Sequence, residues 1–168
     1  MARAVRARAA WRLGAYALSL LALEGCAIHG LSLRQDDRIS VTRPLGRPSI
    51  DLPVTVAWKV HDFVVGPDRG SFALFVDRTP PPAGKTIGWL FRNADDCPSK
   101  RECSDAAYLA QHDIFRTMRT SFVVDRVTTG GRDRGRFHDV TIVLLDEQGR
   151  RLGEGAWSVQ FAVRGEQQ

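Results

Sequence analysis

The chain has 168 residues and a formal net charge of +5, but four of its 24 basic residues and one of its 19 acidic residues lie in the first 25 positions. The rest of the chain therefore carries 20 basic and 18 acidic side chains, a charge of +2. This balance is typical of an ordinary soluble surface and excludes the strongly basic face that nucleic-acid binding requires. A chain of this length is expected to form one domain.

Residues 1–25 have the pattern of an export signal. Four arginines precede an uncharged, apolar run over residues 13–23. Eleven apolar residues are too few to cross about 30 Å of hydrocarbon as a permanent helix, so we expect the segment to be cleaved. The mature chain is then expected to work outside the cytoplasm.

The end of this segment, Leu23-Glu24-Gly25-Cys26, resembles the lipobox of bacterial lipoproteins. Leu23 is the branched apolar residue of that motif, Gly25 is the small residue before the cut, and Glu24 departs from the usual small or neutral residue. The resemblance implies cleavage after residue 25 and an acyl chain, such as palmitate, on Cys26. The alternative is ordinary cleavage after Ala27, which would remove Cys26.

If Cys26 is acylated, the lipid bilayer is the first partner of the protein, because acyl chains contribute far more membrane affinity than a charge of +2. The mature protein would face the periplasm or the exterior. Ala27 and Ile28 lack the aspartate that resembles an inner-membrane retention signal, which favours the outer membrane in a cell with two membranes. Residues 26–38 are expected to form the lipidated cysteine and a flexible tether.

From Ile39 onward, the hydrophobic pattern has a period of two, which indicates strands. Residues 71–77 are apolar on both faces and are expected to form a central strand. Residues 114–118 and 121–127 could be one bent strand or two. The last two strands are expected to form a hairpin, with Gly149 in a left-handed position and a bulge near Gly153 and Gly155. The expected strands cover residues 39–42, 52–60, 71–77, 86–91, 114–118, 121–127, 138–146 and 156–164.

One short helix is expected near residues 104–111, with Ser104 as its N-cap. Just before it lie Cys97 and Cys103, which form a natural disulfide pair in an oxidising compartment once Cys26 carries lipid. The bridge would close a seven-residue loop and add about 2.4 kcal/mol by the loop-entropy formula. Its spacing does not fit the C-x-x-C redox motif, so the expected role is structural.

Together these elements predict an all-β fold, a two-layer antiparallel sandwich of about seven strands over residues 39–164, followed by a tail at 165–168. The strand pattern resembles that of immunoglobulin-like and fibronectin type III-like domains. The inter-sheet cysteine pair and the tyrosine corner of antibody domains are missing. The resemblance therefore implies a fold and transfers no functional residue.

The residues give no sign of catalytic chemistry, so we expect no enzyme and no cofactor. The sequence contains no G-x-S-x-G elbow and no cysteine with an available histidine. The pairs His61-Asp62 and His112-Asp113 offer metal-type donors, but their spacing matches no known site and we expect no metal. Asp95-Asp96 is interpreted as a solvated acidic turn rather than a calcium site.

A glycine-rich loop over residues 128–136 carries the candidate site for an anionic ligand, because guanidinium groups pair with phosphate or carboxylate in a forked geometry. The alternative is a solvated polar loop. The candidate arginines are Arg126, just before this loop, and Arg132, Arg134 and Arg136 within it.

Three tryptophans, Trp58, Trp89 and Trp157, could form a sugar-binding platform. Each lies on the apolar side of an expected strand, which favours core positions.

The sequence thus favours a membrane-anchored, non-catalytic binding or assembly module whose partner is another envelope protein, reached by a sheet edge or by loops. A glycan- or metal-binding receptor domain is the first alternative, and an accessory enzyme is the second.

Overall fold

The computed structural model describes residues 35–95, 97, 103, 105–128 and 137–164. All of them belong to the compact unit Leu33–Gln168, and the unit Met1–Ser32 lies outside the described residues. Within the described ranges no helix has both the length and the apolar character needed to cross a membrane.

The expected all-β sandwich is confirmed. The strands are β1 (Ile39–Arg43), β2 (Ser49–Ile50), β3 (Val54–Val60), β4 (Ser71–Val76), β5 (Ile114–Thr117), β6 (Ser121–Val124), β7 (His138–Leu145) and β8 (Trp157–Val163). The helical elements are the 3-10 helix η1 (Ile87–Phe91) and the α-helix α2 (Ala106–Gln111).

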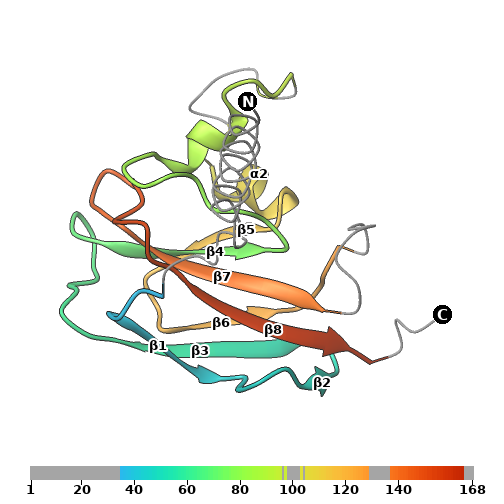
Figure 1. Ribbon diagram of the computed structural model, residues 1–168. Helices are drawn as coiled ribbons and strands as arrows, with labels where there is room; N and C mark the ends of the chain where they lie inside the picture. Colours follow the sequence, from blue (N-terminus) through green and yellow to red (C-terminus); the bar gives the residue numbers. More distant parts are fainter. Residues whose placement is uncertain (1–34, 96, 98–102, 104, 129–136, 165–168) are drawn as a thin grey trace, which may run out of the picture. The chain divides into compact units, whose positions relative to one another are not determined.

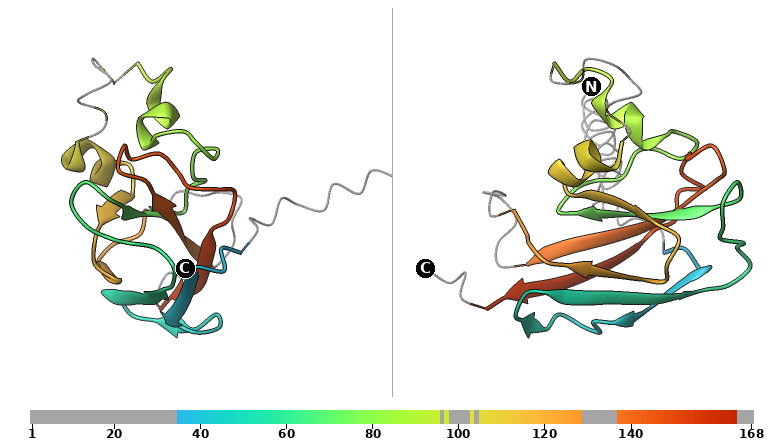
Figure 2. Two further views of the ribbon diagram at one scale, coloured as in Figure 1. Left: turned by 90° about the vertical axis from the view of Figure 1, so that its left-hand side faces the viewer. Right: turned by 180° about the vertical axis from the view of Figure 1, so that it is seen from behind.

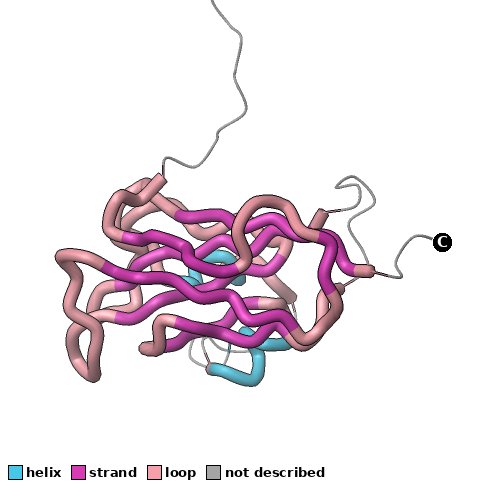
Figure 3. The backbone as a smooth tube through the Cα atoms, turned by 90° about the horizontal axis from the view of Figure 1, so that it is seen from below, coloured by secondary structure: helices cyan, strands magenta, loops and turns pink. Residues whose placement is uncertain are grey.

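The strands form two sheets, of order β1-β3-β6 and β2-β8-β7-β4-β5 (Figures 1 and 3). Neighbouring strands are antiparallel except for the short β2, which runs parallel to β8. β1, β3 and β6 stand where an immunoglobulin-like domain has strands A, B and E, and β4, β7 and β8 stand where it has C, F and G. β5 extends the second sheet beside β4, so β5 and β6 are each the last strand of their sheet.

The inter-sheet core follows from the alternation of apolar side chains along the strands. Trp58 of β3 is 3% exposed and meets Phe72 of β4 edge to face, with ring centroids 5.2 Å apart. The other fully or nearly buried members of this core are Ile39, Val41, Val56, Leu74, Val76, Val124, Val140, Ile142, Leu144, Val159 and Phe161.

A second core, which we call the outer core, covers the other face of β4 and β7. Because these two strands are apolar on both faces, their outward side chains also need cover. The cover is supplied by η1, α2 and the two cysteines Cys97 and Cys103. Both η1 and α2 lie beside β4 and β5 and away from β1 and β3 (Figures 1 and 2). The buried members are Ala73, Phe75, Ile87, Phe91, Cys103, Leu109, Ile114, Val143, Leu145 and Ala156.

The segment expected as a strand over residues 86–91 is instead η1, so this prediction was wrong. Ile87 and Phe91, the first and last residues of η1, are both buried in the outer core. Only Thr86 makes a β-type contact, an isolated bridge to Arg150. The expected short helix is present as α2, and its N-cap is Asp105, one residue after the predicted Ser104. The Asp105 side chain accepts from the backbone N–H of Tyr108 at 2.7 Å.

Residues 35–38, expected in the flexible tether, are attached to the domain. The backbone N–H of Asp36 donates to the carbonyl of Ala156 at 3.2 Å, and Gln35 forms a parallel bridge with Ala156. The Asp36 residue is only 7% exposed, and its carboxylate accepts from the Arg38 guanidinium at 2.8 and 3.0 Å. These contacts attach the chain to the domain as early as four residues before the expected first strand.

The hairpin of β7 and β8 is confirmed, with Val140 opposite Val159 and Ile142 opposite Trp157. Gly149 has φ of +72°, the left-handed conformation predicted for this loop. The link between β7 and β8 is longer than a tight turn, because β7 ends at Leu145 and β8 begins at Trp157. Within this link, Arg151 forms an isolated antiparallel bridge to Leu145.

Candidate functional site

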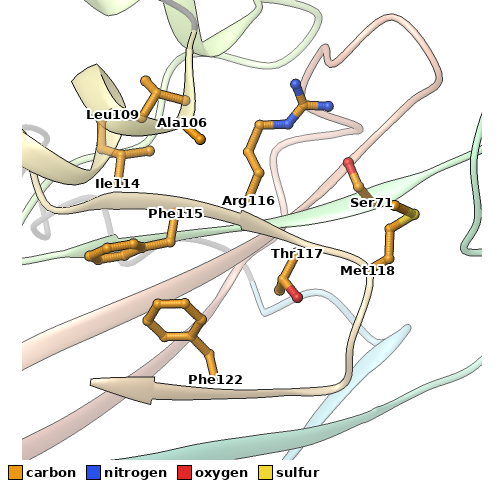
Figure 4. A pocket seen from close by; sticks show the side chains of 9 residues that line it. All are labelled: Ser71, Ala106, Leu109, Ile114, Phe115, Arg116, Thr117, Met118 and Phe122. Atoms are coloured by element: carbon orange, nitrogen blue, oxygen red, sulfur yellow. The ribbon is translucent and has the colours of Figure 1, made fainter. Parts of the chain in front are cut away.

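A cavity of about 330 Å³ lies along β5, between α2 on one side and β6 on the other (Figure 4). Its size is at the lower end of the range for ligand-binding pockets, about 300–1,000 Å³. We call it the edge groove. It is lined by Ser71, Ala106, Leu109, Ile114, Phe115, Arg116, Thr117, Met118 and Phe122.

The edge groove exists because β5 and β6, which are consecutive in the chain, belong to different sheets. The connection through residues 118–120 carries the chain from one sheet to the other. Phe115 of β5 and Phe122 of β6 face each other across the gap, with ring centroids 4.7 Å apart (Figure 4). Two aromatic rings therefore line this side of the groove, where each sheet ends.

The lining comes from both faces of β5. Phe115 and Thr117 lie on the inner face, while Ile114 and Arg116 lie on the outer face toward α2. The buried Leu109 of α2 covers the outer side. The groove thus follows the strand edge itself, and this arrangement is suited to an elongated ligand.

Arg116 is the only ionisable residue of the lining, and its side chain is exposed. Within the described part of the chain it forms no ion pair. Its guanidinium is therefore available to a carboxylate or phosphate.

The disulfide predicted between Cys97 and Cys103 is present, with Cα atoms 5.6 Å apart. Cys103 is buried in the outer core, and Cys97 packs against the same cluster. The bridge therefore joins two residues that both pack in the outer core. Cys26, the predicted lipidation site, lies outside the described residues.

The basic loop is only partly within the described ranges. Arg126 is exposed, and its guanidinium donates to the carbonyl of Ala110 near the end of α2 at 3.2 Å. That position suits a cation because backbone carbonyls are unpaired at a helix C-terminus. Arg132, Arg134 and Arg136 lie outside the described residues.

The histidines and tryptophans singled out in the sequence are dispersed. His61 is exposed, whereas His112 lies against Phe91 and Tyr108, with ring centroids 4.8 and 4.5 Å away. The described residues include no group of three or more metal-type ligands. Trp58 is buried in the inter-sheet core, Trp157 is half-buried against it, and Trp89 is half-buried beneath the Arg92 guanidinium, 3.6 Å from its ring. A shared sugar-binding platform is therefore absent from these three residues.

A carboxylate–imidazole pair, not expected from the sequence, joins β4 to β7. Asp77 Oδ2 lies 2.7 Å from Nδ1 of His138, and Asp77 Oδ1 accepts from the backbone N–H of Asp139 at 2.9 Å. Asp77 has φ of +53°, a left-handed conformation that aspartate tolerates. The pair orients the imidazole and fixes the end of β7. The only related signal in the sequence was that Asp77 ends one predicted strand and His138 begins another.

A buried cation, Arg151, lies in the link between β7 and β8. Arg151 donates to the carbonyls of Pro81, Glu154 and Gly155 at 2.8, 2.6 and 3.3 Å. Burial lowers the pKa of Arg151, although Glu154 and Asp36 nearby act in the other direction. Arg151 therefore connects Pro81 to the link between β7 and β8.

Asp36 lies in the same region. Burial alone would raise the pKa of Asp36, but hydrogen bonds from Arg38 and the charges of Arg38 and Arg151 lower it below its ordinary value. The carboxylate is therefore held in its charged form by Arg38, while the backbone N–H of Asp36 attaches this segment to Ala156.

Searches for similar proteins gave no match to a protein-family model, a curated protein or a solved structure. The functional argument therefore depends on the residues and their geometry.

The edge groove was missed at the level of sequence. Residues 114–118 and 121–127 were recognised as strand-forming, but their pattern does not tell which sheet each strand joins. The available signal was the short turn between two apolar segments of uncertain pairing. The groove could be found only once the sheet order was known.

Proposed function

We propose that this protein is a lipid-anchored, non-catalytic binding module of the bacterial envelope, and that it holds another envelope protein at the edge groove. The single observation that supports a binding role is the apolar groove between two terminal strands with one unpaired cation at its side. Unpaired strand edges are common sites of protein recognition.

An exposed apolar residue of the groove also supports a protein partner. Met118 lines the groove and is 54% exposed. A large apolar side chain exposed at the margin of a cavity is typical of an interaction surface.

The proposed anchor depends on the sequence Leu23-Glu24-Gly25-Cys26. Intact-mass analysis of the protein extracted from membranes is expected to show a chain that begins at Cys26 and carries acyl chains. Cys26→Ser should move the protein from the membrane fraction to the soluble fraction. A full-length, unmodified chain in the membrane would contradict the anchor.

The proposed partner is tested by placing a photoreactive amino acid at position 118 in cells. A matched control is position 64, because Val64 is similarly exposed, at 59%, and does not line the groove. We expect a discrete cross-linked product of higher mass from position 118 and not from position 64. Identical products from both positions, or none from position 118, would rule out this binding surface.

A further inference from the structure

The backbone of β5 has an open side. The N–H of Val76 donates to the carbonyl of Asp113 at 2.9 Å, which fixes the phase of the ladder between β4 and β5. Antiparallel strands alternate between hydrogen-bonded and non-hydrogen-bonded pairs, so the backbone groups of Phe115 and Thr117 point toward β4. Those of Arg116, between them, point away from β4. Within the described part of the chain no hydrogen bond to another element uses them.

The edge groove runs along this open side, so a chain lying in it would meet both backbone and side chains. Side chains of a bound strand alternate between two faces. On the inner face they would meet Phe115 and Phe122, and on the outer face they would meet Arg116 and Leu109. The inner positions are therefore suited to apolar side chains, and the position beside Arg116 is suited to a carboxylate.

We propose that the partner binds as an extended peptide that adds a strand to β5, with apolar side chains alternating with an acidic side chain that pairs with Arg116. This inference rests on the proposed function and names the chemistry of its partner. A peptide satisfies the outward N–H and C=O of Arg116, whereas a fatty acid in the same groove would leave both without a partner. The observations therefore favour a peptide over a free acyl ligand.

The test uses random nine-residue peptides displayed on phage and selected against the purified mature protein. We expect enriched sequences in which acidic and apolar residues alternate. Synthetic versions should bind Arg116→Glu at least tenfold more weakly than the unmodified protein. Arg119→Glu is the matched control because Arg119 is exposed, follows β5 closely and does not line the groove. It should bind as the unmodified protein does.

A second measurement needs no protein variant. Methylating the backbone nitrogens of the enriched peptide removes donors without changing side chains. Methylation of the alternate set that faces β5 should abolish binding, while methylation of the other set should leave the dissociation constant within about threefold. Equal effects of the two sets would overturn strand addition, as would selected peptides that bind Arg116→Glu normally.

The two proposals fail separately. One outcome is a partner that cross-links at position 118 while neither Arg116→Glu nor methylation of the peptide backbone weakens binding. That result would keep the proposed function and overturn strand addition. Strand addition would also be overturned if dodecanoate bound the groove in an Arg116-dependent manner and no displayed peptide were enriched. Loss of the position-118 product in cells would instead remove the proposed function itself.

Discussion

Replacing Arg151 with methionine tests whether the buried cation stabilises the domain. Methionine keeps an unbranched apolar stem and removes every side-chain donor. The carbonyls of Pro81, Glu154 and Gly155 then lose their bonds to the guanidinium. The backbone bonds of residue 151, from its N–H to Lys85 and from Gly84 to its carbonyl, are unchanged.

The expected loss follows from the exposure of each acceptor. A buried polar group without a partner costs about 1–3 kcal/mol. Pro81 is buried and would carry most of this cost, whereas Glu154 is exposed and Gly155 is half-buried, so their carbonyls regain water. The guanidinium Nε has no hydrogen-bond partner among the described residues, and removing it relieves some desolvation. The net loss in the free energy of unfolding is about 1–3 kcal/mol.

Urea denaturation followed by tryptophan fluorescence measures this loss, because Trp58 lies in the inter-sheet core. A fall of about 3–10 °C in Tm is the corresponding thermal signal. Arg150→Met is the matched control, since Arg150 is exposed and its bonds to Asp146 use its backbone N–H and carbonyl, which the substitution keeps. Its free energy of unfolding should change by no more than about 0.5 kcal/mol. Equal stability of the two variants would refute the reasoning.

Three further predictions concern other interactions that stabilise the domain. The double variant Cys97→Ala and Cys103→Ala should lower the free energy of unfolding by about 2 kcal/mol, and a reductant should then have no additional effect in urea denaturation. Because the pKa of Asp36 is lowered in the folded state, its stabilisation is complete above the unfolded pKa of about 3.9 and is lost as the pH falls through the folded value. Asp36→Asn should therefore flatten the acid side of the stability–pH curve, and an unchanged slope would contradict this assignment. In Gly155→Ala the new Cβ would lie 2.9 Å from Asp36 Cβ and 3.0 Å from its Cα, so we expect a loss of about 1–3 kcal/mol and faster proteolysis at residues 35–38. Gly66→Ala, where nothing lies within 4 Å, is its neutral control.

The sequence predicted the sandwich because alternation along residues 39–42 and 52–60 is typical of a strand with one face buried. The same rule failed over residues 86–91. Ile87, Trp89 and Phe91 fit a period of two, yet the segment folds as η1 and buries Ile87 and Phe91 in the outer core. The decisive factor is the second apolar face of β4 and β7, which η1 helps to cover.

The candidate site was less predictable than the fold. The disulfide followed from the count and spacing of cysteines, because local covalent geometry constrains it. The edge groove depends on long-range pairing of β4 with β5 and of β3 with β6, which no local pattern encodes. Arg116 looked like one of many exposed arginines until its neighbours were known. The buried role of Asp36 was hidden because its polar flanking residues are typical of a linker.

The place where the chain enters the fold affects how a docked protein would be presented. Gln35 bridges to Ala156 at the β8 side of the five-stranded sheet, and β7 and β4 separate β8 from β5 at the other margin. A guest that adds to β5, as proposed, would therefore bind at the margin of this sheet opposite the side on which residues 35 and 36 join the domain.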